Sequence, residues 1–216
     1  AMKLKRSRVL RIIGLGMSGF TMSITNSSVQ VMYNAMLQKT GGDLYVGIMT
    51  VINTVREVIS MPVQGITHSS QPVMGYNYGA KEYRRVNKIY RLALTIAIGI
   101  MTAGTLLFMF TPETFMKMFT TQETTIAAGA SALRIISCGF IVSSVSVVSS
   151  GALEALGKGN ESLVVSLLRY LVIIVPLAFV LSRFIGANGV WHSFWITETV
   201  TAFVAYGIYR KALRNK

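Results

Sequence analysis

Six long apolar stretches run through this chain and restrict the folds open to it. They lie near 12–37, 45–75, 91–111, 125–151, 162–182 and 188–209. A helix needs about 20 residues to cross the roughly 30 Å of hydrocarbon in a bilayer, and each stretch reaches that length. Turn-forming sequences separate them, such as KTGGD at 39–43 and GKGN at 157–160. The pattern predicts an all-α membrane protein with six transmembrane helices, and residues 1–216 are expected to form a single transmembrane bundle.

The composition favours a membrane location over a nucleic-acid interface. Hydrophobic residues make up 52% of the chain and charged residues 13%, with a mean hydropathy of +0.53. A soluble domain carries about 25% charge. The net charge of +13 comes from short basic clusters between apolar runs, not from one face of a soluble fold. We therefore expect membrane lipid, and no nucleic acid, as the partner of these basic residues.

Lys and Arg are distributed unequally between the two sides of the predicted membrane. Fifteen of the 21 lie in the N-terminal flank, the second and fourth connections and the C-terminal tail. The alternate connections contain only Lys39, Lys117 and Arg183. Because cytoplasmic loops are enriched in Lys and Arg, this bias predicts that both termini are cytoplasmic.

The segment QPVMGYNYGAKEYRRVNKIYR, at 71–91, has the features of a cytoplasmic membrane border. Its basic residues would face lipid headgroups, and four tyrosines suit an interfacial aromatic belt: Tyr76, Tyr78, Tyr83 and Tyr90. It lacks the GxxxxGK[ST] pattern of a phosphate-binding loop.

Two of the predicted spans have a continuous polar stripe. In the first, the polar residues are Ser23, Asn26, Ser27, Gln30 and Asn34. In the second, they repeat every three or four residues: Asn53, Glu57, Ser60, Gln64, Thr67 and Gln71. Hydrogen bonds between helices contribute only about 0.6 kcal/mol each on average, and would account for one or two such residues. The stripes therefore favour a water-filled cavity lined by these two helices.

Glu198 lies near the middle of the last predicted span, and Trp191 and Trp195 precede it on the same face. An isolated charge at this depth costs at least about 2.5 kcal/mol, so the carboxyl is either protonated or paired, with Arg56 or Arg134 as candidate partners. It could couple transport to protons or cations, or form a fixed structural ion pair. Glu154 is expected to be a solvated or capping acid. The serines at 143–150, with Gly139 and Gly151, are expected to support close helix packing.

No arrangement of residues suggests catalysis or a metal site. Cys138 is the only cysteine, which excludes an internal disulfide. No pair of His, Cys or acidic residues has the spacing of metal ligands, and no nucleophile has a base at a recognisable spacing. We expect neither an enzyme nor a bound cofactor.

Three stretches resemble the multidrug and toxic compound extrusion (MATE) transporters. They are MPVQGITHSSQPVMGYNYGAKEYRRV at 61–86, GALEALGKGNESLVVSLLRYLVIIVPLAFVL at 151–181 and FIGANGVWHSFWITETVTA at 184–202. Members of the family have twelve spans in two six-helix bundles, and this chain resembles the C-terminal bundle. The resemblance implies a multi-pass protein of a bacterial-type plasma (inner) membrane. It would export cationic amphipathic compounds in exchange for protons or sodium, by alternating access between the two bundles.

The resemblance also implies roles for particular residues. Gln30, Asn34, Asn53 and Glu57 would line the substrate path, and Glu198 matches an acid that many members place near the middle of the last helix, which makes it a candidate for ion coupling. From the polar stripe and the last span themselves, we add Gln64 and Trp195 as candidates for the lining and Glu57 as a second candidate for ion coupling. Transport would require a second six-helix bundle, either an N-terminal half or another copy of this chain. Two alternatives remain open: a membrane module that binds ligands without transport, and half of a lipid-linked oligosaccharide flippase.

Overall fold

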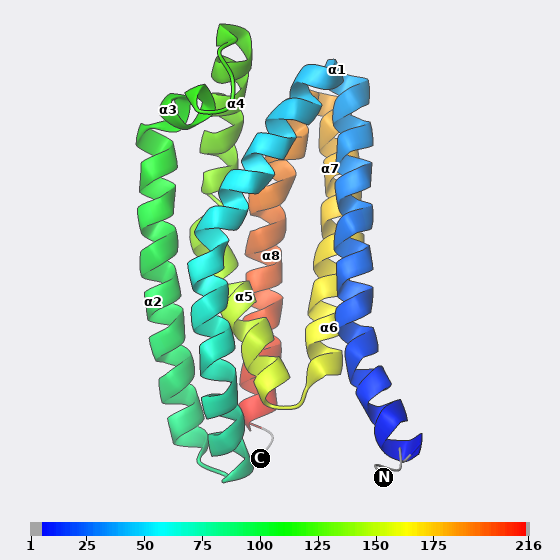
Figure 1. The fold of residues 1–216 in the computed structure, drawn as a ribbon, viewed down its shortest axis with the longest axis vertical. Coiled ribbons are helices and arrows are strands. Elements are labelled where there is room, and N and C mark those ends of the chain that lie inside the picture. Colours follow the sequence, from blue (N-terminus) through cyan, green and yellow to red (C-terminus); the bar gives the residue numbers. More distant parts are fainter. Residues whose placement is uncertain (1–5, 215–216) are drawn as a thin grey trace, which may run out of the picture.

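The computed structural model describes residues 6–214, with side chains from residue 20 onward. All regular structure in this range is helical (Figure 1). The elements are α1 (Arg6–Gly79), α2 (Tyr83–Phe110), α3 (Pro112–Lys117), α4 (Glu123–Ser137), α5 (Phe140–Ala155), α6 (Gly159–Leu167), the π-helix η1 (Leu168–Ile173), α7 (Ile174–Ile185) and α8 (Ala187–Arg214).

α1 consists of two arms joined at Gly42: a first arm, 6–41, and a second arm, 43–79. The Gly42 backbone has φ 71° and ψ −164°, a conformation readily available only to glycine. Across the bend, Gln38 Nε2 donates a hydrogen bond to Asp43 Oδ1 at 2.8 Å. Figure 1 shows the first arm (blue) rising to the bend and the second arm (cyan) returning from it. The predicted break at 39–43 is therefore confirmed.

Of the other predicted spans, 91–111 corresponds to the unbroken helix α2, whereas the rest are broken or more polar than expected. Among the described residues, Phe20–Gly79, Tyr83–Phe110 and Gly159–Ile185 are long and apolar enough to cross a membrane. The predicted span 125–151 is divided into α4 and α5, a pair bent by 51° that together could form one further crossing. α8, which contains the predicted span 188–209, is not among these helices, and several of its polar residues are turned inward and buried, such as Ser193, Thr197 and Thr201. The number of six spans stays a prediction.

Glycines allow α5 to pack closely against α1 and α8. A Cβ atom on Gly151 would overlap Cγ2 of Thr67 in the second arm of α1. A Cβ atom on Gly139, just before α5, would lie 3.0 Å from the Cα atom of Trp195. Both positions therefore require glycine for close approach, which confirms the packing role predicted for them.

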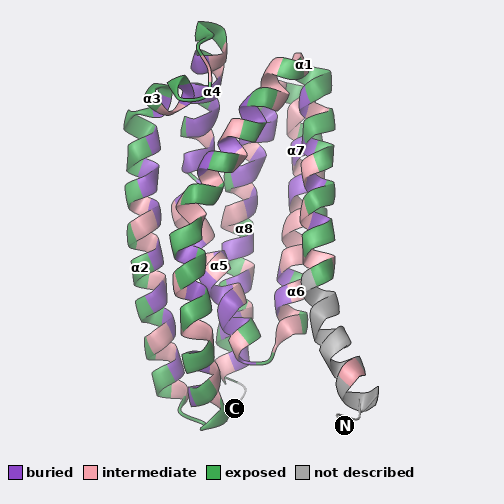
Figure 2. Ribbon diagram, in the orientation of Figure 1, coloured by how far each residue is buried: buried purple, intermediate pink, exposed green. Residues whose placement is uncertain are grey.

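Large apolar side chains cover much of the outside of the bundle, whereas its interior is packed. Phe110, Phe184 and Phe203 are 76–82% exposed, as expected for side chains in contact with lipid tails. Figure 2 shows the buried residues on the faces that the helices turn toward one another. The exposed apolar surface agrees with a multi-pass membrane protein.

Tyr90 does not belong to an interfacial belt, so that part of the prediction is wrong. Its ring stacks on Tyr209 of α8 with the centroids 4.0 Å apart, and its hydroxyl lies 2.8 Å from Ser149 Oγ of α5. The side chain is buried because it joins α2, α5 and α8, whereas Tyr76 remains exposed.

Candidate functional site

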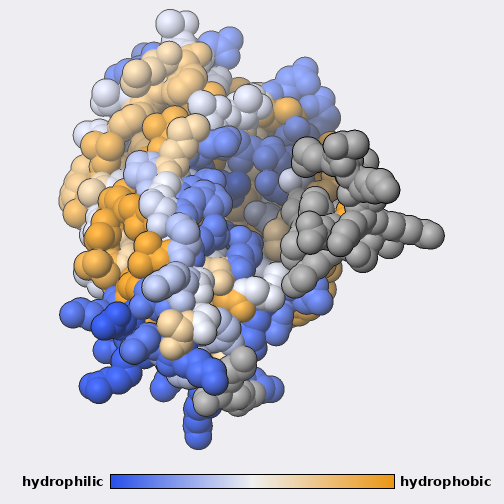
Figure 3. Space-filling model, turned by 60° about the horizontal axis from the view of Figure 1, so that its bottom comes forward, coloured by the Kyte–Doolittle hydropathy of each residue, from blue (hydrophilic) through white to orange (hydrophobic). Residues whose placement is uncertain are grey.

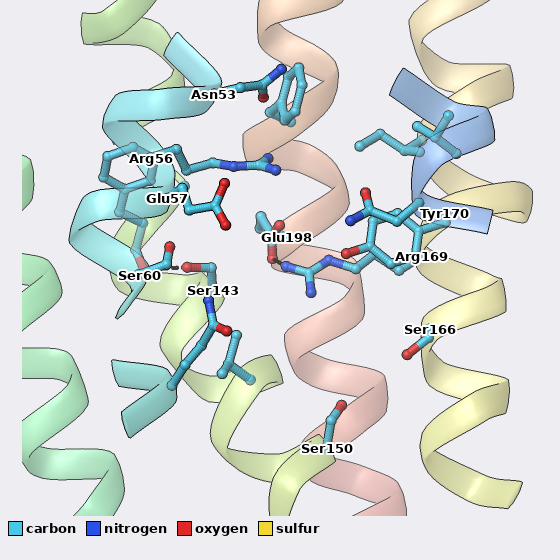
Figure 4. Close-up of a pocket in the computed structure, with 18 of the residues that line it drawn as sticks. Asn53, Arg56, Glu57, Ser60, Ser143, Ser150, Ser166, Arg169, Tyr170 and Glu198 are labelled. Atoms are coloured by element: carbon cyan, nitrogen blue, oxygen red, sulfur yellow. Dashed lines mark hydrogen bonds and ion pairs between the residues drawn. The ribbon is translucent and has the colours of Figure 1, made fainter. Parts of the chain in front are cut away.

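A cavity of about 460 Å³ lies inside the bundle, bordered by both arms of α1, α5, η1 and α8 (Figure 4). This volume is within the range of small-molecule sites, roughly 300–1,000 Å³. Figure 3 shows hydrophilic side chains gathered in a hollow, with apolar surface to one side. The polar residues that α1 contributes are Asn26, Gln30, Asn53, Arg56, Glu57, Ser60, Gln64, Thr67, His68 and Gln71.

The predicted polar stripes of α1 converge on this cavity. All six polar residues of the second stripe line it, and the first stripe contributes Asn26 and Gln30. Asn53 Nδ2 donates a hydrogen bond to Gln30 Oε1 at 3.3 Å, which joins the two arms of α1 at the cavity wall. The spacing of polar residues therefore predicted this wall correctly.

Of the individually predicted site residues, Gln30, Asn53, Glu57, Gln64 and Glu198 line the cavity. Their roles in binding or coupling stay predictions.

Asn34 and Trp195 lie outside the cavity lining. Asn34 is exposed, and the neighbouring Tyr33 is the residue of that turn that reaches the cavity. Trp195 Nε1 donates a hydrogen bond to Nδ1 of His192 at 3.0 Å. Phe194, and not Trp195, lines the cavity. Phe194 and Glu198 are four residues apart, which is about 40° more than one helical turn, so the two side chains lie on nearly the same face of α8.

Glu198 forms an ion pair with Arg169 of η1 (Figure 4). The prediction that Arg56 or Arg134 would be its partner is therefore wrong. Only 17% of the Arg169 side chain and 12% of the Glu198 side chain is exposed, and Ser146 Oγ lies 3.4 Å from Glu198 Oε2. A charge at this depth is stabilised by a nearby opposite charge, because leaving it alone is costly. The pair connects η1 to α8 across the bundle.

Arg56 and Glu57 point from the second arm of α1 into the same space (Figure 4). The Arg56 guanidinium carbon lies 5.5 Å from the centre of the Phe194 ring, within the range of a cation–π contact. Within the described part of the chain, neither Arg56 nor Glu57 has an ion-pair partner within 4.0 Å. Among the described residues Glu57 therefore forms no ion pair, although the Arg56 guanidinium lines the same cavity.

An aromatic wall closes the cavity beside these charges. The rings of Tyr33 and Phe194 stack with their centroids 4.8 Å apart, and the Tyr33 hydroxyl lies 3.1 Å from Ser193 Oγ. Tyr170 of η1 lines the cavity as well. Aromatic faces beside a carboxylate suit an organic cation, which interacts with both.

Glu154 is exposed, in agreement with its prediction as a solvated acid, and it also borders the cavity and links two helices. Gln71 Nε2 donates to Glu154 Oε2 at 3.1 Å, and Ser162 Oγ donates to Glu154 Oε1 at 3.0 Å. The carboxylate thereby connects the second arm of α1 with α6. His68 Nδ1 lies 3.4 Å from Gln71 Oε1 and extends this polar chain.

Comparison with known proteins agrees with this arrangement. The MatE family profile matches residues 19–180. The chain belongs to the MatE family. The multidrug export protein MepA of Staphylococcus haemolyticus is 22% identical over 211 residues, which cover 98% of this chain and 46% of MepA. MepA of Staphylococcus aureus (strain N315) is 24% identical over 206 residues, covering 94% and 44% of the two chains. This MatE chain thus spans about half the length of these relatives.

Solved structures of MATE transporters share the fold. A crystal structure of MATE in complex with MaL6 has a TM-score of 0.91 and 22% identity, covering 100% of this chain and 50% of that one. An inward-facing MATE family transporter has a TM-score of 0.90 and 22% identity, covering 99% and 50%. The chain is therefore a multi-pass membrane bundle that corresponds to half of a MATE transporter.

Three groups in this MatE half were not predicted as parts of the site. Arg169 is an isolated cation in an apolar run, and that isolation was the available signal for it. Ser143 and Ser150 line the cavity, whereas α5 was expected to provide packing alone; Ser144, Ser146 and Ser149 are buried. The π-helix η1 carries Arg169 and Tyr170 on a widened turn, and π-turns inside helices often occur at functional sites.

Proposed function

We propose that the chain is the C-terminal, six-helix half of a multidrug antiporter. It would export cationic amphipathic compounds across a bacterial-type plasma membrane in exchange for protons or sodium. Both termini would lie in the cytoplasm, as the distribution of Lys and Arg favours. Alternating access would require a second six-helix bundle that rocks against this one.

The observation that carries this proposal is the free carboxylate of Glu57 in a polar cavity beside aromatic side chains. A lipophilic cation can place its charge near Glu57 and its rings against Tyr170, the half-buried aromatic side chain of the lining. The MepA relatives, which are named multidrug export proteins, support the same substrate class.

Glu57 and Glu198 would have different roles in coupling. Glu57 has no ion-pair partner in the described part of the chain, so a proton, sodium ion or cationic substrate can compete for it directly. Glu198 is engaged by Arg169, so its protonation would release the link between α8 and η1. An antiporter requires such competition, because ion and substrate must not occupy the site together.

One observation favours a second candidate, half of a lipid-linked oligosaccharide flippase. Arg56 and Arg169 place two guanidinium groups in the cavity, and guanidinium groups are suited to binding phosphates. That candidate requires an anionic ligand to bind at Arg56, whereas the antiporter requires a cation to bind at Glu57.

Efflux from cells distinguishes these proposals. Cells that express the chain, alone or with an N-terminal half, are loaded with ethidium, and its loss is followed by fluorescence. The antiporter predicts efflux that Glu57→Gln abolishes and that Glu123→Gln, an exposed acid outside the cavity, leaves unchanged. Absence of efflux from well-inserted protein in both settings would contradict transport of cationic drugs.

A further inference from the structure

A second hollow, of about 430 Å³, lies between the first turns of α6 and the last turns of α8. It shares no lining residue with the central cavity. Figure 1 shows the start of α6 and the end of α8 at the same end of the bundle. The residues that line it include Lys158, Asn160, Glu161, Val164, Ile208 and Lys211.

The hollow is polar near the end of the bundle and becomes apolar farther along the helix axes. Val164 follows Glu161 by three residues along α6, and Ile208 precedes Lys211 by three residues along α8. At 1.5 Å per residue, each apolar side chain lies about 4.5 Å deeper along its helix than the nearby charge. Val164 is 55% exposed, so this wall is open to lipid. A phospholipid has the same order of a charged headgroup followed by apolar chains.

The charges at the rim match a headgroup with a single negative charge. Lys158 Nζ lies 3.7 Å from Glu161 Oε1, so these two side chains partly neutralise each other. Lys211 is exposed and has no ion-pair partner in residues 6–214. Two lysines and one glutamate leave one net positive charge, which one phosphodiester would balance. The Glu161 carboxylate can also accept a hydrogen bond from a headgroup hydroxyl.

We propose that this hollow binds an anionic glycerophospholipid of the phosphatidylglycerol type. Its phosphate lies between Lys158 and Lys211, and the Asn160 amide donates a hydrogen bond to it. The glycerol hydroxyls reach Glu161, and one acyl chain follows Val164 and Ile208. The site is separate from the proposed transport cavity and does not depend on what that cavity carries.

Native mass spectrometry of the detergent-solubilised chain, with equimolar phosphatidylglycerol and phosphatidylcholine, tests the site. The unaltered chain is expected to retain phosphatidylglycerol in preference to phosphatidylcholine. Lys211→Gln is expected to lower that retention about tenfold, the effect of losing one charge-assisted hydrogen bond. The matched control is Lys88→Gln, which removes the same charge from an exposed position outside the hollow and should change nothing.

A second variant separates the acyl-chain groove from the charges. Val164→Trp fills the apolar wall but keeps every charge, and it should also lower phosphatidylglycerol retention, with an unchanged size-exclusion profile as the test of folding. Equal losses for the Lys211 and Lys88 variants would overturn the proposal in favour of general attraction to a basic surface. Displacement of the lipid by millimolar inorganic phosphate would indicate an ion site, and retention after Val164→Trp would exclude the groove.

Discussion

Breaking the Arg169–Glu198 ion pair from one side is expected to destabilise the bundle strongly. Arg169→Met leaves the Glu198 carboxylate 12% exposed, with Ser146 Oγ at 3.4 Å as its remaining polar contact. Removing one partner of a buried pair costs about 3–5 kcal/mol, and we take about 3 kcal/mol here because both side chains keep some exposure. For a chain of this length, that corresponds to a fall in melting temperature of roughly 6–12 °C.

The double variant Arg169→Met, Glu198→Gln should regain most of this stability. It removes both charges, and replacing a buried pair with neutral side chains of similar volume is often close to neutral. Thermal melting in detergent, monitored by size-exclusion chromatography, compares the unaltered chain, the two single variants and the double variant in a double-mutant cycle. If the two single losses simply add in the double variant, the residues do not interact and the reasoning is refuted.

Three further substitutions test the packing of the bundle. Gly151→Ala should lower the free energy of unfolding by about 1–3 kcal/mol because its Cβ atom meets α1, whereas Gly207→Ala, in open space, should not; melting curves compare them. Gly42→Ala should cost about 1–3 kcal/mol because of its positive φ, whereas the helical Gly47→Ala should be neutral or stabilising, measured in the same way. Tyr90→Phe should lose about 1 kcal/mol with its buried hydrogen bond, and unchanged melting would contradict that bond.

Periodicity predicted the elements that depend on local sequence. The break at Gly42 followed from a glycine-containing turn, and the polar wall of the second arm followed from residues repeated every three or four positions. Both depend on only a few neighbouring residues, and both are confirmed.

Pairing between distant helices could not be predicted in the same way. Glu198 required a partner, but Arg56, Arg134 and Arg169 all lay within apolar spans, and only the tertiary arrangement brings Arg169 to it. Trp195 and Phe194 are adjacent in the chain, and a rotation of about 100° decides which of them reaches the cavity. The division of 125–151 into α4 and α5 likewise falls next to Gly139, which packs closely against the distant helix α8.

Equilibrium binding of ethidium to the purified chain tests most directly whether Glu57 provides the cation site. The proposal predicts that Glu57→Gln weakens binding at least tenfold, since a charge-assisted contact contributes about 1.5–3 kcal/mol. Glu123→Gln, which removes an acid outside the cavity, should leave the affinity unchanged. Equal affinities for the unaltered chain and Glu57→Gln would contradict the proposal, because the free carboxylate would then have no part in binding the cation.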